Sequence, residues 1–224
     1  MATHLDLEEQ EQLAELKHFW TRYGNLITWV LVAALTAYAG WTAWQYWQRR
    51  QADAASALYD AVEQAAKAGD ADKVARAFTD MKDRYPGTVY AAQSALLAAK
   101  TLADKGRRDE AKGALQWAAD QAGESEYRLI ARLRLAGLQL DAKLYDDALK
   151  TLSGDFPGAF AALAADRRGD VLQAQGKAAE AVTAYQQAHK AMDEAVDYRR
   201  LVEAKLIALG APPAAEPAAS GASR

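Results

Sequence analysis

The side chains that could perform chemistry are few in this sequence and stand apart from one another. The three histidines are His4, His18 and His189, and none has a second histidine or a carboxylate at a spacing that makes a convincing metal site. The chain contains no cysteine, which excludes a thiolate zinc site, a disulfide framework and a cysteine nucleophile. It also lacks GxSxG, HExxH and a glycine-rich phosphate loop. These absences predict a protein that is not an enzyme and uses neither a cofactor nor a metal ion.

Charged residues offer no better candidate for a site. Three arginine pairs could bind an anion, but helix-end charges and solvated faces explain them more simply; they are Arg107-Arg108, Arg167-Arg168 and Arg199-Arg200. Four of the 27 Lys and Arg and five of the 30 Asp and Glu precede residue 51, which leaves 23 basic and 25 acidic residues in the rest. Because nucleic-acid binding requires a clustered positive face, this balance predicts no nucleic-acid partner.

The most informative segment is an uncharged apolar run, residues 26–47, with the sequence LITWVLVAALTAYAGWTAWQYW. A helix of this length spans roughly 33 Å, slightly more than the hydrocarbon core of a bilayer, which is about 30 Å. Trp and Tyr favour the headgroup level, so the aromatic and basic residues in and beside the run predict the two membrane interfaces. The predicted interface residues are Trp20, Tyr23, Trp41, Trp44, Trp47, Arg49 and Arg50. The sequence therefore predicts a transmembrane anchor in the lipid bilayer.

Two other interpretations of this run are a buried core helix and a cleaved secretory signal. Charge-free runs of this length are rare in globular cores. Ala37–Ala39 before Gly40 resembles a signal-peptidase site. However, the preceding region is long and acidic, the apolar run continues past that site, and its tryptophans lie where an interface belongs. An uncleaved anchor is the favoured interpretation.

The charges beside the run do not fix its orientation. Lys17 and Arg22 lie near one end, and Arg49 and Arg50 lie near the other, so the positive-inside rule gives a tie.

The segment before the anchor, residues 1–25, is predicted to contain an amphipathic helix. Five apolar residues fall on one face at helical spacing, with acidic residues opposite: Leu13, Leu16, Phe19, Trp20 and Tyr23. Because its net negative charge disfavours anionic lipid, we expect this helix to dock on a partner protein.

The chain after the anchor reads as helix throughout, with no alternation typical of a half-buried strand. Residues 48–209 are predicted to form one helical domain, and the proline- and alanine-rich residues 210–224 are predicted to be a disordered tail. The predicted helices cover 52–68, 71–84, 88–104, 108–121, 125–141, 145–152, 159–175, 178–191 and 195–208.

A repeat runs through this helical domain. The segments KAGDADKVARAF, ADKGRRDEAKGAL, LDAKLYDDALKTL and QAQGKAAEAVTAY align with turns at Gly69, Gly106, Lys143 and Gly176. The intervals of 37, 37 and 33 residues are in the range of helix-hairpin repeats. Small or modest residues recur twelve positions apart across each turn, where two antiparallel helices would cross closely: Val62 with Val74, Ala99 with Ala111, Ala136 with Ala148, and Gly169 with Ala181.

These landmarks resemble the tetratricopeptide repeat. Gly169, Ala181, Tyr185 and Ala188 stand where that motif has its glycine, alanine, aromatic residue and second alanine, and Pro86 stands at its terminal proline. The predicted fold is therefore all-α: a single N-terminal transmembrane helix followed by a tetratricopeptide-like α-solenoid of helical hairpins. Such solenoids usually bind partners on a concave face.

Nearly the whole chain is similar to the family of ancillary subunits of the bacterial SecYEG translocon. The matching segments are Glu11–Lys17, Phe19-Trp20, Tyr23-Gly24, Gly40-Trp41, Trp44–Trp47, Leu133–Ala136, Ala148–Leu152 and Ala165–Asp170. The resemblance implies a single-pass inner-membrane protein with a cytoplasmic N-terminus and a periplasmic repeat domain. It also implies association with SecYEG and with a membrane-anchored periplasmic chaperone of the parvulin-like class.

The function that this resemblance implies is a noncatalytic adaptor that links the translocation of secretory proteins to periplasmic chaperones. The alternative is a tetratricopeptide scaffold or assembly factor for another cell-envelope complex, because the same repeats serve many complexes.

Overall fold

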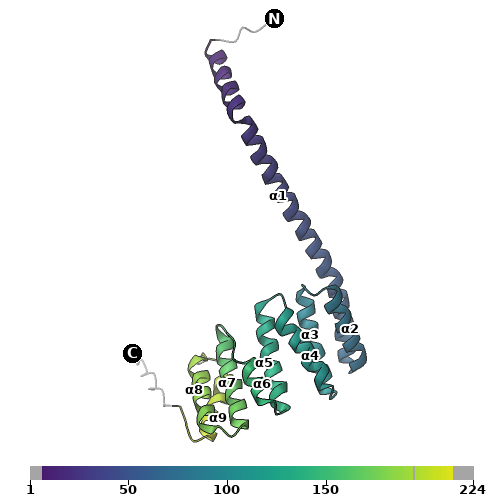
Figure 1. Cartoon of the computed structure of the whole chain (residues 1–224), viewed down its shortest axis with the longest axis vertical. Coiled ribbons are helices and arrows are strands. Elements are labelled where there is room, and N and C mark those ends of the chain that lie inside the picture. The colour runs from purple at the N-terminus through teal and green to yellow at the C-terminus, as the bar shows by residue number, and fades with distance from the viewer. Residues whose placement is uncertain (1–6, 194, 214–224) are drawn as a thin grey trace, which may run out of the picture. The chain divides into compact units, whose positions relative to one another are not determined.

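The computed structural model describes residues 7–193 and 195–213, and every regular element in these ranges is a helix (Figure 1). Residues 1–6 and the part of the predicted disordered tail from 214 onward lie outside the described residues. The predicted all-α class is confirmed. The helices are α1 (Leu7–Lys67), α2 (Ala71–Arg84), α3 (Val89–Asp104), α4 (Arg108–Gln121), α5 (Ser125–Asp141), α6 (Tyr145–Thr151), α7 (Ala159–Ala174), α8 (Ala178–Ala191) and α9 (Tyr198–Ala208).

The main difference from the predicted helices concerns α1. The sequence analysis began a separate helix at residue 52, whereas α1 runs without interruption to Lys67. The polar residues 48–51 include neither glycine nor proline, so nothing in the backbone ends the helix there. The other predicted boundaries agree with the structure to within three residues.

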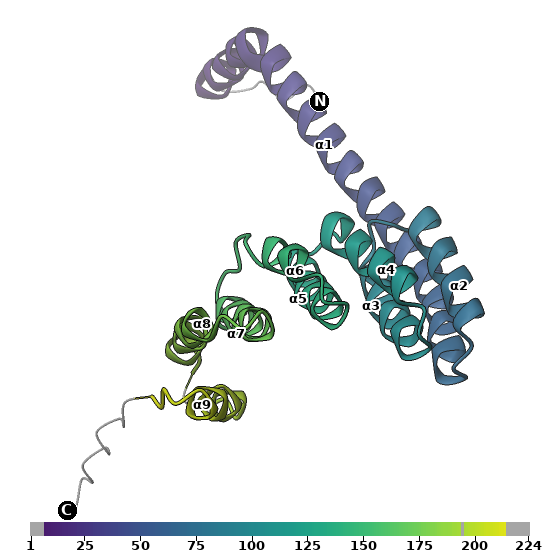
Figure 2. The same cartoon turned by 60° about the horizontal axis from the view of Figure 1, so that its bottom comes forward.

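The chain divides into two compact units, one up to Gln51 and one from Ala52 onward. In the second unit, successive helices pack as antiparallel pairs. Figure 2 shows α3, α5, α7 and α9 along the inner side of an arc, with α2, α4, α6 and α8 outside them. The helical-hairpin solenoid predicted from the repeats is therefore the observed architecture.

Every hairpin turn in this unit has the same local geometry. A residue with positive φ ends the first helix of each hairpin: Gly69, Gly106, Lys143 and Gly176, with φ of 65°, 78°, 60° and 78°. The N–H of Gly106 donates to the Ala103 carbonyl at 2.9 Å, and the next N–H, of Arg107, donates to the Leu102 carbonyl at 2.8 Å. This pair of bonds is a Schellman-type ending, which satisfies carbonyls that the helix leaves unpaired.

A fifth ending of this type follows α9 and was missed by the sequence analysis. Gly210 has φ of 73°, its N–H donates to Ile207, and the N–H of Ala211 donates to Leu206 at 3.0 Å. Pro212 and Pro213 come directly afterwards, so the pattern of a second helix that identified the other turns is missing here. Helix α9 is thus the first half of a further repeat.

Substitution of Lys143 tests whether its turn has the same left-handed geometry as the glycine turns. A lysine at positive φ has a steric cost that glycine avoids, so Lys143→Gly should raise the free energy of unfolding by about 0.5–1 kcal/mol. The reverse change at an equivalent turn, Gly106→Ala, should lower it by about 1 kcal/mol. Urea unfolding of the full chain in detergent, followed by circular dichroism, measures both. A loss of stability in Lys143→Gly would contradict the turn assignment.

Candidate functional site

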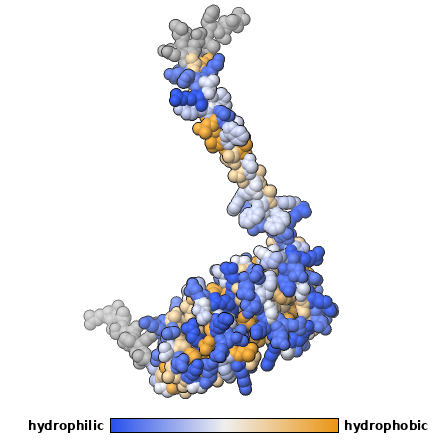
Figure 3. Space-filling view, in the orientation of Figure 1, coloured by the Kyte–Doolittle hydropathy of each residue, from blue (hydrophilic) through white to orange (hydrophobic). Residues whose placement is uncertain are grey.

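The N-terminal unit exposes its apolar residues instead of burying them. Among the described residues, one helix contains a stretch long and apolar enough to cross a membrane, and none of that stretch is buried. Figure 3 shows hydrophobic side chains gathered along the middle of α1. The interpretation of this run as a core helix therefore does not agree with the structure.

The three threonine hydroxyls inside this run are satisfied within the helix. The hydroxyls of Thr28, Thr36 and Thr42 donate to carbonyls one turn earlier, at 2.8, 2.8 and 2.9 Å. Such internal pairing is required in lipid, where no water is available for these groups. The chemistry of the segment is therefore compatible with a hydrocarbon environment.

The predicted interface residues lie at the two ends of the run, and most of their side chains are exposed. Trp41 and Trp44 pack ring to ring at 5.6 Å, and the Arg50 guanidinium lies 5.0 Å above the Tyr46 ring. At the other end, Arg22 lies 5.7 Å from the Tyr23 ring. Amphipathic aromatic rings with basic neighbours are the groups that a headgroup region accommodates.

The amphipathic face predicted before the anchor is also exposed. Its members are between 41% and 63% accessible; they are Leu13, Leu16, Phe19, Trp20 and Tyr23. No residue of the described N-terminal unit covers this face.

A groove in the second unit is lined mainly by α3, α5 and α7, the helices along the inner side of the arc. Its volume is about 590 Å³. Its lining combines apolar and charged side chains; it includes Ala103, Leu133, Leu138, Lys100, Asp104, Arg134, Gly137, Asp141 and Arg167. A groove of this kind can hold a peptide segment by apolar contact and charge pairing.

Charges in the groove are unequally paired. Lys100 and Asp104 pair with each other at 2.8 Å. Arg134 has no ion-pair partner among residues 7–193 and 195–213. The Arg167 guanidinium carbon lies over Gly137, 4.0 Å from the position that a Cβ there would take, and its one ion pair is a long one, 3.4 Å to Asp170. Two arginines thus retain free hydrogen-bonding capacity on the inner face.

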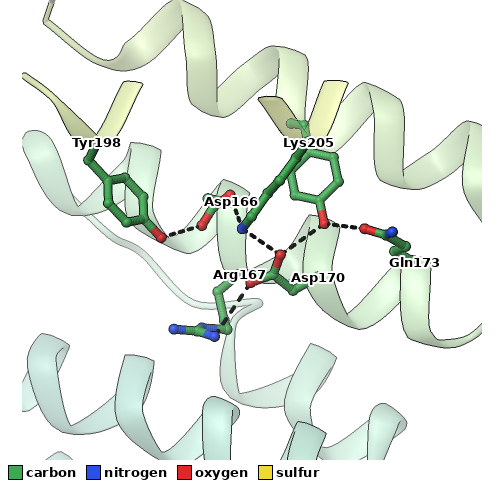
Figure 4. Close-up of polar contacts among 7 residues, drawn as sticks. Asp166, Arg167, Asp170, Gln173, Tyr198 and Lys205 are labelled. Atoms are coloured by element: carbon green, nitrogen blue, oxygen red, sulfur yellow. Dashed lines mark hydrogen bonds and ion pairs between the residues drawn. The ribbon is translucent and has the colours of Figure 1, made fainter. Parts of the chain in front are cut away.

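A compact polar cluster joins α7, α8 and α9 (Figure 4). The Lys205 ammonium donates to Asp166 at 2.8 Å and to Asp170 at 2.6 Å. Tyr198 donates to the second oxygen of Asp166 at 2.7 Å, and the Tyr185 hydroxyl lies 2.8 Å from both Asp170 and Gln173. Asp166 is 1% exposed, so its charge requires these partners. The cluster fixes the last helix to the solenoid.

Both tyrosines of this cluster keep their protons over a wide pH range. Burial raises the pKa of Tyr185, and the hydrogen bond to Asp170 raises it further. Burial, followed by the bond to Asp166, raises the pKa of Tyr198 in the same way. Because both folded-state pKa values exceed the unfolded value near 10, this contribution to stability is present below about pH 10 and is lost as the pH rises through the folded pKa values.

Close helix packing brings Tyr185 to this position. A Cβ at Gly169 would lie 2.5 Å from two carbons of the Tyr185 ring, so the ring passes where only glycine leaves room. The Tyr185 ring therefore crosses α7 at Gly169 and reaches the carboxylate of the next residue, Asp170.

The residues predicted for repeat packing are all buried; they are Ala99, Ala111, Ala136, Ala148, Gly169, Ala181, Tyr185 and Ala188. They are distributed along α3 to α8. Of the eight, only Gly169 and Tyr185 take part in the polar cluster, Gly169 by leaving the space that the ring occupies.

Two of the arginine pairs provide structural contacts. Arg107 pairs with Asp72 at 2.7 Å and with Glu110 at 2.6 Å, which ties one hairpin to the previous one. Arg168 donates to the Leu152 carbonyl at the end of α6, at 3.0 Å.

The sequence analysis missed the cluster around Lys205. Asp166 stands ten residues before its turn residue, where the preceding repeats have Leu96 and Leu133. Lys205 stands five residues before Gly210, where an earlier repeat has Leu138. Charged residues at two apolar positions of adjacent repeats were a signal for an ion pair between them.

No arrangement for metal chemistry was found in the described residues: none of their His, Asp and Glu form a group of three or more able to hold an ion.

Comparisons with known proteins agree with this architecture. A family model described as a tetratricopeptide repeat-like domain matches residues 17–211. An ancillary SecYEG translocon subunit of Neisseria gonorrhoeae is 34% identical over 93% of this chain and 100% of its own length. Proteins with the same description from Escherichia coli and Haemophilus influenzae are 27% and 29% identical, over 75% and 82% of this chain and 81% and 90% of their own lengths. No solved structure matches the chain.

The Lys205 cluster generates a stability prediction. Lys205→Met removes the cation shared by two poorly exposed carboxylates, so the free energy of unfolding should fall by about 3 kcal/mol. Lys190→Met, on the exposed surface of α8, is the matched control and should change it by less than about 0.5 kcal/mol. Urea unfolding of the full chain in detergent measures both. Equal stability of the two variants would show that the cluster does not hold α9.

Proposed function

The chain belongs to the tetratricopeptide-repeat-like family of ancillary SecYEG translocon subunits, and we propose that it is a noncatalytic, membrane-anchored adaptor. It associates with the translocon and links the translocation of secretory proteins to periplasmic chaperones by protein contacts. The observation that carries this proposal is the similarity to the N. gonorrhoeae subunit, which covers 93% of this chain and the whole of that subunit.

The physical arrangement supports an adaptor. The exposed apolar stretch of α1 provides the anchor, and the helical hairpins after it provide a surface for partners. Anchoring places that surface at a high effective concentration near other membrane proteins, so that weak contacts suffice. Residues 26–47 cross the inner membrane in this proposal, and the residues at its interfaces are Trp20, Tyr23, Trp41, Trp44, Trp47, Arg49 and Arg50.

The two parts have different partners in this proposal. The anchor contacts the translocon within the bilayer. The repeat domain, residues 48–209, lies in the periplasm and contacts a membrane-anchored chaperone of the parvulin-like class. The N-terminal segment, residues 1–25, lies in the cytoplasm.

The lack of cysteine allows a direct test of this topology. Ser153→Cys places a single thiol on the exposed loop after α6, and Thr3→Cys places one in the N-terminal segment. A membrane-impermeant maleimide added to spheroplasts should label Ser153→Cys at once and Thr3→Cys only after the membrane is permeabilised. The opposite order of labelling would reverse the topology, and labelling of both would refute a single span.

Partner association has its own test. The full-length protein, purified from membranes in mild detergent, should bring SecY-type channel subunits and a periplasmic chaperone, identified by mass spectrometry. Deleting residues 52–213 should abolish chaperone recovery and keep the channel subunits. Replacing residues 26–47 by an unrelated single span should do the reverse. Recovery of another envelope complex, without the translocon, would favour an assembly factor instead.

A further inference from the structure

Equivalent positions of successive repeats recur on the inner helices of the solenoid, and the residues at these positions determine which ligands can bind. Arg134, Arg167 and Leu201 each stand nine residues before a left-handed turn residue, at Lys143, Gly176 and Gly210 respectively. They therefore occupy the same position in three successive repeats. These positions lie on α5, α7 and α9, the helices along the inner side of the arc (Figure 2), and we call the three equivalent positions the row.

The first two members of the row are cations without strong partners. Arg134 has no ion pair among the described residues, and Arg167 has one long contact with Asp170. Asp170 is itself engaged by Lys205 at 2.6 Å and by Tyr185 at 2.8 Å. Arg167 contacts Asp170 through one nitrogen only, at 3.4 Å, so the other N–H groups of its guanidinium are available to a ligand.

Two acidic residues, Asp104 and Asp141, also line the groove and restrict where an anionic ligand can lie. Asp104 is neutralised by Lys100 at 2.8 Å. Asp141 lies about two helical turns after Arg134 on α5, and no ion pair joins the two side chains in the structure. An acidic side chain is therefore favoured along the arginine row and disfavoured near Asp141.

The third member of the row changes the chemistry from charged to apolar. Leu201 is 48% exposed and Ile207, on the same helix, is 55% exposed. Ala204 is exposed on the same helix and adds no charge. The residues after Gly210 that the structure describes, Ala211–Pro213, contain no large apolar side chain that could cover this surface.

We propose that the inner groove binds an extended partner segment that carries acidic side chains next to a large apolar one. The acidic groups pair with Arg134 and Arg167, which line the groove, and the apolar group packs on the exposed Leu201 of α9, beyond the groove. Adjacent helices are about 8–10 Å apart, and an extended chain advances about 3.3 Å per residue. Successive members of the row therefore contact every third residue of the partner segment. This inference rests on the proposed function, since it specifies how the repeat domain holds its partner.

The test uses a fluorescent nine-residue peptide, acetylated and amidated so that its only charges are on side chains. It has glutamates at its second and fifth positions, leucine at its eighth, and glycine and serine elsewhere. Fluorescence anisotropy with the full-length protein in detergent should show about ten-fold tighter binding than for the same peptide with lysines in place of glutamates. Serine in place of the leucine should also weaken binding.

Variants of the protein assign the contacts. Arg134→Glu should weaken binding of the glutamate peptide about ten-fold and strengthen that of the lysine peptide. Leu201→Ser should weaken binding and abolish the difference between the leucine and serine peptides. Arg108→Glu, an exposed charge reversal on the outer helix α4, is the matched control and should leave binding unchanged. Circular dichroism verifies that each variant is folded.

The outcomes separate this inference from the proposed function. Equal binding of the two charged peptides, or equal effects of Arg134→Glu and Arg108→Glu, would overturn the groove assignment. Recovery of SecY-type subunits with Arg134→Glu should match the wild type, because that contact is made by the anchor. Failure of the wild-type protein to recover the translocon would refute the proposed function while leaving the peptide result standing.

Discussion

Close approach of the two helices in each hairpin is the constraint on which the repeat domain depends. Ala99, Ala136 and Gly169 occupy the same position of successive repeats, and all three are buried. Small side chains let helix backbones come together, and a left-handed turn residue reverses the chain within a few residues. This combination places the first helix of every repeat on the same side, so a continuous inner face follows from it.

The last repeat shows what happens when the pattern ends. At the position of Ala99, Ala136 and Gly169, helix α9 has Glu203, which is partly exposed. A charged residue at this position disfavours close packing of a second helix, because its charge would be buried without a partner. It also makes the end of the array polar, as terminal repeats require for solubility. Helix α9 is instead held through Lys205 and Tyr198 to the buried carboxylate of Asp166. An ion pair thus replaces part of the apolar contact that joins the earlier repeats.

This ionic attachment also shapes the inner face. Lys205 supplies one positive charge for the two carboxylates of Asp166 and Asp170, and the long contact of Arg167 with Asp170 supplies the second. The same contacts hold α9, on which Leu201 is 48% exposed. The cluster that attaches α9 therefore also contacts Arg167, one of the arginines that line the groove.

Local pattern was enough to predict much of this protein. Three features could be predicted from a single sequence: the charge-free residues 26–47, the helical periodicity and the four turn positions. Each depends only on residues that are close together in the chain. The Neisseria, Escherichia and Haemophilus relatives show the family that the sequence resembles. The spacing of the repeats also applies to α9. The turn at Gly210 was not predicted, because two prolines follow it in place of a second helix.

Only the tertiary structure decided which distant residues meet. Lys205 lies 39 residues from Asp166 in sequence, and the pair forms because α9 packs beside α7. The proximity of Arg167 to Gly137 likewise depends on how two hairpins stack. Sequence by itself determined the elements, because backbone preferences and apolar periodicity are local. Their stacking determined the groove and the ion pairs, because burial and Coulomb interactions depend on distances in space.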